Sequence, residues 1–134
     1  MNVLGIGAHF DDLELGCSGT LIKHVQNGDK VTMLVITNSS YNNPNGELIR
    51  AANVAYEEGL KAANIIGAEL ICLNINTFFV PFEESLTSEI DRYVEELNID
   101  VLYSPWLHDL HRDHHYAAKN ALMAGRRVPR FLMY

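Results

Sequence analysis

Asn2-Val-Leu-Gly-Ile-Gly7 is a short apolar run at the start of the chain, and two acidic residues, Asp11 and Asp12, follow it closely. The run has the length and composition of a buried β-strand. After these two acidic residues, apolar residues recur at roughly helical spacing as far as Asn27-Gly28, a pair that is typical of a helix end. The chain therefore opens with a predicted strand, a polar turn and a predicted helix.

The same alternation continues along the whole chain. Further strands are predicted at 30–37, 69–73, 100–104 and 130–134, and further helices at 47–66, 83–97 and 113–125. Polar or irregular loops are predicted at 38–46 and 74–82, the second with two adjacent phenylalanines. Strands that alternate with helices predict parallel strands joined by right-handed crossovers. We therefore predict an α/β fold, a Rossmann-like three-layer αβα domain with a five-stranded, mainly parallel sheet in the order 3-2-1-4-5.

Length and composition indicate one soluble domain that spans residues 1–134. Apolar residues make up 48% of the chain and charged residues 20%, as in ordinary globular proteins. The net charge of −7 argues against binding to nucleic acids or anionic membranes, because both need a positive face. No apolar run approaches the roughly 18–20 residues of a membrane span, and no signal-peptide pattern is found. Two distant cysteines, Cys17 and Cys72, predict reduced thiols in a cytoplasmic protein.

Two clusters of histidine and aspartate fall in loops that this topology brings together. In the predicted order, strands 1 and 4 are neighbours where the winding of the sheet reverses, and ligands bind at the carboxyl ends of strands beside such a point. The loop after strand 1 is Gly7-Ala-His-Phe-Asp-Asp12, and the loop after strand 4 contains His108-Asp-Leu-His-Arg-Asp-His-His115. Four of the six histidines lie within these last eight residues. This coincidence predicts a functional site between the two loops.

The residue types in these loops are those of a catalytic metal site. Neutral imidazoles with a carboxylate are ligands that zinc favours, and three protein ligands leave a fourth position open for water. His9 and Asp12 are three residues apart across a strand-to-helix turn, so both can face one ion, and a histidine of the second loop would complete the set. Asp11 is then free to accept a proton from the water.

Each of these residues also has a purely structural interpretation. Asp11 or Asp12 could cap the helix that follows, and Asp113 could cap the helix after the second loop. A lone His9 beside an aromatic residue could be a hydrogen-bonded histidine of the core. The remaining histidines that we assign to structural or surface positions are His24 and His115.

Two motifs resemble those of a known family. Ala8-His-Phe-Asp-Asp12 resembles the AHPDD motif of the PIG-L/LmbE-like N-deacetylases, with Phe10 in place of the usual proline. His111-Arg-Asp-His114 resembles that family's HPDH motif, and the two motifs occur in the family's order. The resemblance covers nearly the whole chain, and it implies a single LmbE-like deacetylase domain that lacks the usual C-terminal extension.

The resemblance implies a metal-dependent hydrolase of linear amides, which removes the acetyl group of an N-acetylglucosamine-type amino sugar or its conjugate. It implies Zn²⁺ as the cofactor, or another divalent metal such as Fe²⁺. The implied metal ligands are His9, Asp12 and His114. Asp11 would be the general base, and His111 would stabilise the oxyanion or protonate the leaving amine. Asp113 would orient His111 and hold it protonated.

Two rival hypotheses come from other classes of function. The first is a catalytically inactive or incomplete α/β module that binds a metal or a sugar. The second is a hydrolase of another bond, such as a phosphoester, which is disfavoured because Arg112 alone supplies a basic side chain inside either motif. The expected partner is a small-molecule amino sugar. The apolar last strand favours association into a homo-oligomer, since an exposed edge invites pairing.

Overall fold

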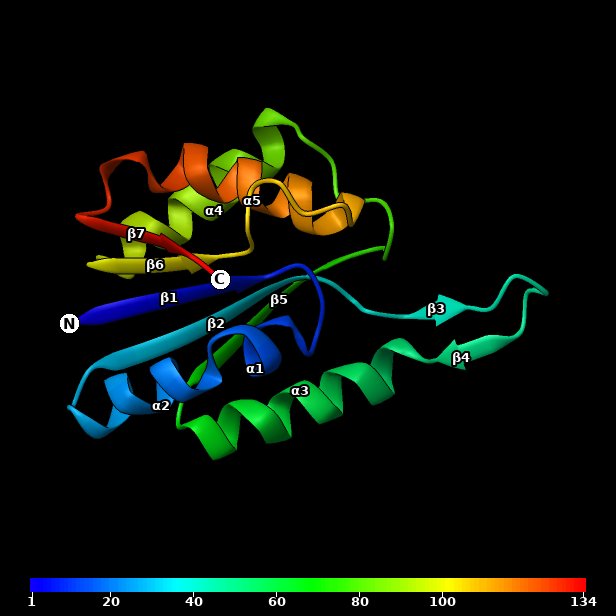
Figure 1. The fold of residues 1–134 in the computed structure, drawn as a ribbon, viewed down its shortest axis with the longest axis horizontal. Coiled ribbons are helices and arrows are strands. Elements are labelled where there is room, and N and C mark those ends of the chain that lie inside the picture. The colour runs from blue at the N-terminus through cyan, green and yellow to red at the C-terminus, as the bar shows by residue number, and fades with distance from the viewer.

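The computed structural model describes residues 1–134 and shows a parallel sheet between two layers of helices (Figure 1). The strands of this sheet are β1 (Asn2–Gly7), β2 (Lys30–Thr37), β5 (Glu69–Ile75), β6 (Val101–Ser104) and β7 (Arg130–Met133). Their order is β5-β2-β1-β6-β7, and every neighbouring pair is parallel. The predicted α/β fold and strand order 3-2-1-4-5 are therefore confirmed.

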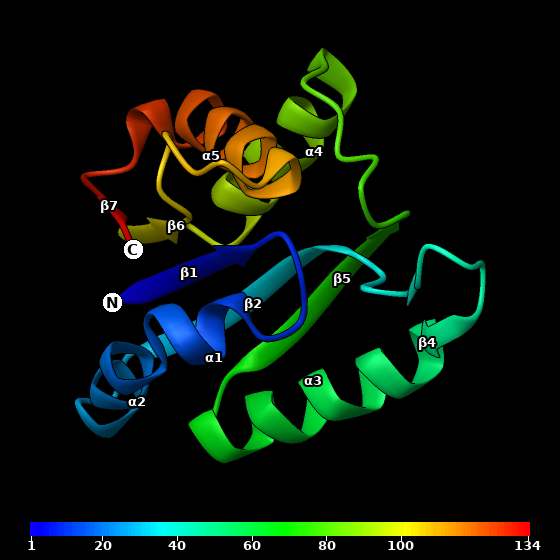
Figure 2. The ribbon, with the colours of Figure 1, turned by 45° about the vertical axis from the view of Figure 1, so that its right-hand side comes forward.

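Helices cover both faces of the sheet. The helices are α1 (Asp12–Gly16), α2 (Ser18–Gln26), α3 (Ala52–Ile66), α4 (Glu84–Glu96) and α5 (Arg112–Ala124), and a short 3₁₀ turn (Gly125–Arg127) follows α5. Figure 2 shows α1, α2 and α3 on one side of the sheet and α4 and α5 on the other. None of these helices combines the length and the apolar character that a bilayer-spanning segment requires.

The alternation of side chains along each strand divides the core between the two faces. On β1, Leu4 and Ile6 pack with apolar residues of α4 and α5, whereas Val3 packs with residues of α1, α2 and α3. Because both faces are covered, the strands are almost continuously apolar, which is why they are recognisable in the sequence. The sheet is thus a rigid frame whose carboxyl edge carries the loops with the histidine and aspartate clusters.

The region between β2 and α3 differs from the prediction. A small antiparallel hairpin, β3 (Tyr41–Asn42) and β4 (Leu48–Arg50), extends from the sheet, so the prediction that a helix begins at residue 47 was wrong (Figure 1). The turn of the hairpin is stabilised by Asn43, whose side-chain oxygen accepts hydrogen bonds from two backbone N–H groups, and by Gly46 at φ 83°. This local hydrogen bonding competes with the helix.

Two other boundaries are shifted. The predicted first helix is divided into α1 and α2 at Cys17, where the backbone leaves the helical region. Strand β5 continues to Ile75, two residues beyond its predicted end at Leu73. The irregular loop before α4 is confirmed, and Phe78 adopts a positive φ angle in it, as does Asn74 near the end of β5.

Candidate metal and catalytic site

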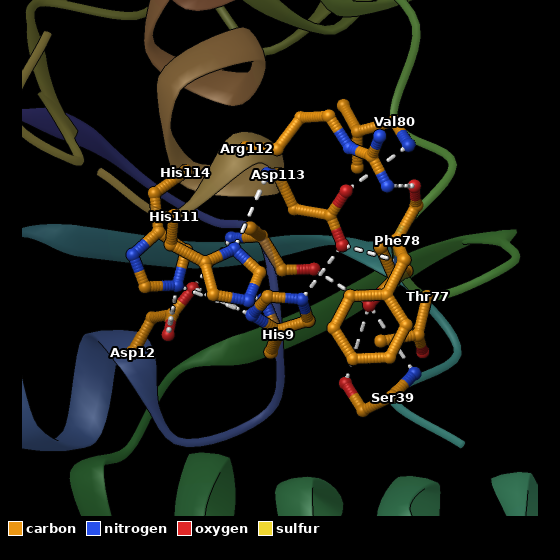
Figure 3. Close-up of polar contacts among 12 residues, drawn as sticks. His9, Asp12, Ser39, Thr77, Phe78, Val80, His111, Arg112, Asp113 and His114 are labelled. Atoms are coloured by element: carbon orange, nitrogen blue, oxygen red, sulfur yellow. Dashed lines mark hydrogen bonds and ion pairs between the residues drawn. The ribbon is translucent and has the colours of Figure 1, made fainter. Parts of the chain in front are cut away.

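The two histidine and aspartate clusters meet at the carboxyl edge of β1 and β6. These strands are direct neighbours, with Gly5 opposite Tyr103, so the loops that follow them lie against each other. His9 comes from the loop after β1, His111 is the N-cap residue of α5, and His114 lies in the first turn of that helix (Figure 3). The predicted convergence of residues more than one hundred positions apart is therefore present, with the His9 and His114 rings in direct contact.

Two imidazole nitrogens and one carboxylate group form a compact triangle. His9 Nδ1 lies 3.2 Å from His114 Nε2, and Asp12 Oδ1 lies 3.2 Å from the same His114 nitrogen. The other oxygen of this carboxylate, Asp12 Oδ2, lies 3.7 Å from His9 Nδ1. Donors held at about 2.0–2.1 Å from a tetrahedral zinc ion are separated by about 3.3 Å, so this triangle has the dimensions of one zinc site.

Hydrogen bonds at the far side of each ring determine which nitrogens carry protons. His9 Nε2 lies 2.9 Å from Asp113 Oδ2, and His114 Nδ1 lies 3.0 Å from Asp109 Oδ2. Since both carboxylates accept, each of these ring nitrogens is the donor, and the lone pairs of His9 Nδ1 and His114 Nε2 face each other. Two lone pairs at 3.2 Å need a cation or a proton between them. A carboxylate behind each ligating imidazole is typical of metal sites, so these residues fit a divalent cation.

The carboxylate of Asp12 is fixed by the backbone of the first loop. Its Oδ2 accepts hydrogen bonds from the N–H groups of Ala8 and His9, both at 2.8 Å, and Oδ1 is left to face His114. Burial raises the pKa of Asp12, but its close contacts with His114 and His9 outweigh this and hold the pKa below its usual range. Asp12 is therefore a permanent negative charge beside the two imidazoles.

The electrostatic environment of His9 favours a positive charge. Burial opposes protonation of His9, but the carboxylates of Asp113 and Asp12 outweigh it and raise the pKa of His9 to about 9. The same carboxylates that stabilise a bound proton would stabilise a bound metal cation at this position.

Asp11 stands beside the triangle with its carboxyl group free. It occupies the N-cap position of α1, yet its side chain makes no capping hydrogen bond, so the structural interpretation as a helix cap is wrong for Asp11. Its φ angle of 128° is a strained conformation for a residue with a side chain, and such strain is common at functional sites. Burial and the neighbouring charge of Asp12 raise the pKa of Asp11, which suits a proton acceptor.

The expected pairing of the Asp113 carboxylate with His111 is not present. The carboxylate is completely buried and accepts hydrogen bonds from His9 Nε2 (2.9 Å), Phe78 N (2.6 Å) and Val80 N (3.2 Å). Only the backbone N–H of Asp113 reaches His111, and it donates to Nδ1 at 3.2 Å. His111 is itself the N-cap of α5, so Asp113 is not the cap either. The physical reason is that the loop after β5 supplies two N–H donors, those of Phe78 and Val80, to this carboxylate.

His111 is accordingly a neutral imidazole rather than a protonated one. Its Nδ1 accepts the backbone N–H of Asp113, which leaves the ring proton on Nε2. Burial and the nearby rings of His114 and His9 lower the pKa of His111, in agreement with this tautomer. The expectation that Asp113 holds His111 protonated was therefore wrong. Nitrogen atoms of His9, His111 and His114 all lie within 4.8 Å of one another, so His111 adjoins the triangle.

A cavity of about 210 Å³ opens beside the triangle. Its lining residues are His9, Asp11, Ser39, Tyr41, Arg50, Thr77, Phe78 and His111. Sequence reasoning selected His9, Asp11 and His111 and missed the other five. A usable signal existed for most of these, because the loops after the second and third predicted strands end at the same edge of the sheet.

Arg50 reaches the cavity from the hairpin. Its Nη1 donates to the carbonyl of Phe10 at 3.2 Å, and its Nη2 pairs with Glu58 on α3 at 2.8 Å. These contacts hold the Arg50 side chain at the wall of the cavity. The histidines assigned to structural positions are elsewhere: His115 hydrogen-bonds to the Leu107 carbonyl oxygen at 2.7 Å, and His24 contacts Asp29 and Tyr103.

The family model described as PIG-L, GlcNAc-PI de-N-acetylase, matches residues 4–124. The chain belongs to this family. The resemblance noted in the two motifs is thus confirmed across almost the full sequence of the chain. The donor triangle, the free Asp11 and the neutral His111 all lie in these motifs.

Individual relatives agree with this assignment. The chain is 28% identical over 142 residues to the uncharacterized deacetylase YaiS of Escherichia coli (strain K12), a match that covers 98% of this chain and 72% of YaiS. It is 31% identical over 121 residues to the diacetylchitobiose deacetylase of Thermococcus kodakarensis, which covers 86% of this chain and 45% of that enzyme.

A solved structure supports the fold. A conserved protein of Thermus thermophilus superposes with a TM-score of 0.83 at 23% identity, over 98% of this chain and 65% of that protein. The chain therefore spans between about half and three quarters of the length of these relatives. The three-layer fold extends over the whole of the part that is shared.

Proposed function

We propose that this chain carries the site of a metal-dependent N-deacetylase that hydrolyses the acetamide of an N-acetylglucosamine-type amino sugar or its conjugate. Membership of the PIG-L family supports this proposal. The observation that carries it is the triangle of His9, Asp12 and His114 with the unpaired carboxyl group of Asp11 beside it. His9 and Asp11 both line one cavity, in which a substrate can reach them. A metal site with an adjacent base is what hydrolysis of an unactivated amide requires.

In this proposal His9 Nδ1, Asp12 Oδ1 and His114 Nε2 hold the cation. A bound divalent ion such as Zn²⁺ supplies Lewis acidity there and makes a water molecule more acidic. Asp113 and Asp109 keep the two imidazoles oriented, because each carboxylate accepts the N–H of one ring. Loss of either carboxylate therefore affects metal binding before it affects any chemical step.

The remaining steps belong to Asp11 and His111. Asp11 accepts a proton as water attacks the acetyl carbon, and the Nε2–H group of His111 donates a hydrogen bond to the carbonyl oxygen as negative charge develops on it. The bond between carbon and nitrogen then breaks, and the proton held by Asp11 passes to the departing nitrogen. The products are acetate and a free amine.

The hypothesis of an inactive binding module is not favoured. Such a module would need the metal ligands alone, yet Asp11 keeps a free carboxyl group with a raised pKa and His111 keeps a donor at the cavity. The test is release of acetate from N-acetylglucosamine and from N,N′-diacetylchitobiose by protein stripped with a chelator and then reloaded with Zn²⁺. We expect acetate release that depends on the added metal. Binding of the sugar without release of acetate would support the hypothesis of an inactive binding module.

A further inference from the structure

Phe78 has an unusual conformation next to the site. Its φ angle is 70°, a left-handed value that residues with a side chain rarely adopt without compensation. Its ring lies against His111, with the ring centroids 5.9 Å apart and the planes 26° from parallel (Figure 3). The side chain is still 45% exposed and forms part of the wall of the cavity. A strained and exposed aromatic residue at a cavity indicates a role in ligand binding.

Asp113 and Arg112 hold Phe78 in this place. The buried carboxylate of Asp113 accepts the N–H of Phe78 at 2.6 Å and that of Val80 at 3.2 Å, while Arg112 Nη2 donates to the carbonyl of Phe78 at 3.0 Å. The same carboxylate bonds to His9 at 2.9 Å. The backbone of Phe78 is therefore connected through one side chain to a proposed metal ligand, so this backbone and the metal site have a fixed relative position.

The other residues that line the cavity have polar side chains. Away from His9, Asp11 and His111, they are Ser39, Tyr41, Thr77 and Arg50. Phe78 adds an apolar surface. The cavity volume of about 210 Å³ is below the range of about 300–1,000 Å³ that is usual for drug-sized ligands, so it suits a single small ring. A pyranose likewise combines polar and apolar surfaces, since its hydroxyl groups lie at the edge of the ring and its C–H groups form an apolar face.

We propose that Phe78 is a specificity-determining residue whose ring supports the apolar face of the amino sugar and thereby selects a cyclic acetamide over an acyclic one. This inference rests on the proposed function, since it assigns the sugar ring to the cavity beside the metal triangle. Aromatic contacts contribute beyond the area that they bury, and a loss of about tenfold in affinity is expected when the ring is removed.

The experiment measures binding rather than turnover. The ligands are glucosamine, which is the amine that the proposed reaction releases, and ethanolamine, which has the amino alcohol unit without the ring. Their dissociation constants for the Zn²⁺-loaded protein are measured by calorimetry for the wild type and the variants Phe78→Ala, Phe78→Gly and Phe79→Ala. Glycine accepts the positive φ angle without strain, so Phe78→Gly removes the ring from a relaxed backbone. Phe79 is 73% exposed and does not line the cavity, which makes it the matched control.

We expect both Phe78 variants to bind glucosamine about tenfold more weakly than the wild type, with ethanolamine unchanged and Phe79→Ala within about twofold for both ligands. An equal effect of Phe78→Ala and Phe79→Ala would overturn the inference, as would equal weakening of both ligands or a wild type that does not bind glucosamine. The proposed function fails by a different result, the absence of acetate release, which these binding constants do not involve.

Discussion

The Nδ1 atom of His9 and the Nε2 atom of His114 face each other at 3.2 Å, and each imidazole is bonded to a carboxylate through its other nitrogen. This relationship joins the loop after β1 to the first turn of α5. Each ring donates a hydrogen bond through the nitrogen that faces its carboxylate, and the nitrogen that faces the other ring has a free lone pair. Two such lone pairs define a position for a cation. The proposed chemistry depends on that position being filled.

Replacement of His114 is expected to abolish metal binding. In His114→Ala, one of three ligands is lost, so we expect the affinity for Zn²⁺ to fall by at least about 100-fold, more than the loss of a residue that only orients a ligand usually causes. Metal content after dialysis, measured by mass spectrometry, checks this. His115→Ala is the control, because His115 hydrogen-bonds to the Leu107 carbonyl oxygen outside the triangle and its loss should leave one metal per chain. Equal metal content in the two variants would show that His114 is not a ligand.

Replacement of Asp11 is expected to separate catalysis from metal binding. Asp11→Asn removes the proton acceptor but no ligand, so acetate release should fall by about 10²–10⁴-fold while the metal content stays at the wild-type level. Initial rates of acetate release, together with metal analysis, measure both quantities. Glu57→Gln, on the exposed side of α3, should change neither. A normal rate in Asp11→Asn would mean that another group is the base.

Replacement of Asp113 is expected to affect stability and metal binding together. In Asp113→Asn, the amide has one acceptor oxygen for the three donors that the carboxylate now accepts, from His9, Phe78 and Val80. We expect a loss of about 1.5–3 kcal/mol in the free energy of unfolding for each bond to the charged group that is lost, and a metal affinity weaker by about 10–100-fold. Urea unfolding and metal titration measure these. Asp109→Asn should cost less stability, because Asp109 lies at the surface. Equal stability of Asp113→Asn and Asp109→Asn would contradict the role of the three hydrogen bonds assigned to the Asp113 carboxylate.

Removal of the metal is expected to lower the melting temperature. Because the ligand triangle exists only in the folded chain, free Zn²⁺ at about 100 times its dissociation constant should add about 2.7 kcal/mol to the free energy of unfolding. A thermal melt with and without a chelator measures the difference as a shift of several degrees, on the order of 2–4 °C per kcal/mol in a domain of this size. The shift should vanish in His114→Ala. A chelator-induced shift of the same size in that variant would place the metal elsewhere.

Phe10, which stands where the family has proline, is packed against α3. Its ring is buried, and a Cβ atom added at Gly59 would lie 2.2 Å from it. Gly59→Ala should therefore displace Phe10 next to His9 and reduce the free energy of unfolding by about 1–3 kcal/mol. In Gly19→Ala the added Cβ meets open space, so that control should be neutral or stabilising by up to about 1 kcal/mol. Chemical denaturation compares the two, and equal stability would show that Phe10 is free to move.

The sheet order and the meeting of the two loops were predictable because both follow from simple patterns. Strands buried on both faces are continuously apolar, and the switch point of the sheet lies between the first and fourth of them. The triangle was predictable as well, because His9, Asp12 and His114 lie in or next to these two loops and come together when the loops meet. The hairpin at 41–50 was missed because its two strands are only two and three residues long and are stabilised mainly by the Asn43 turn.

The partner of the Asp113 carboxylate was not predictable from the motif. The sequence places Asp113 two residues from His111, which suggested a local pair, whereas the observed contacts reach His9 and the loop at Phe78. These residues are distant in the chain, and their approach depends on how the 74–80 segment crosses the end of the sheet. For the same reason the places of Arg50 and Phe78 at the cavity were not predicted, since nothing local marks where their side chains lie.

The most direct measurement is a crystal structure of the Zn²⁺-loaded protein, with anomalous diffraction recorded at the zinc edge. We predict one ion per chain at about 2.0–2.2 Å from His9 Nδ1, His114 Nε2 and Asp12 Oδ1, with Asp11 and His111 outside its coordination sphere. An ion bound by His111 in place of Asp12, or no ion between His9 and His114, would contradict the account.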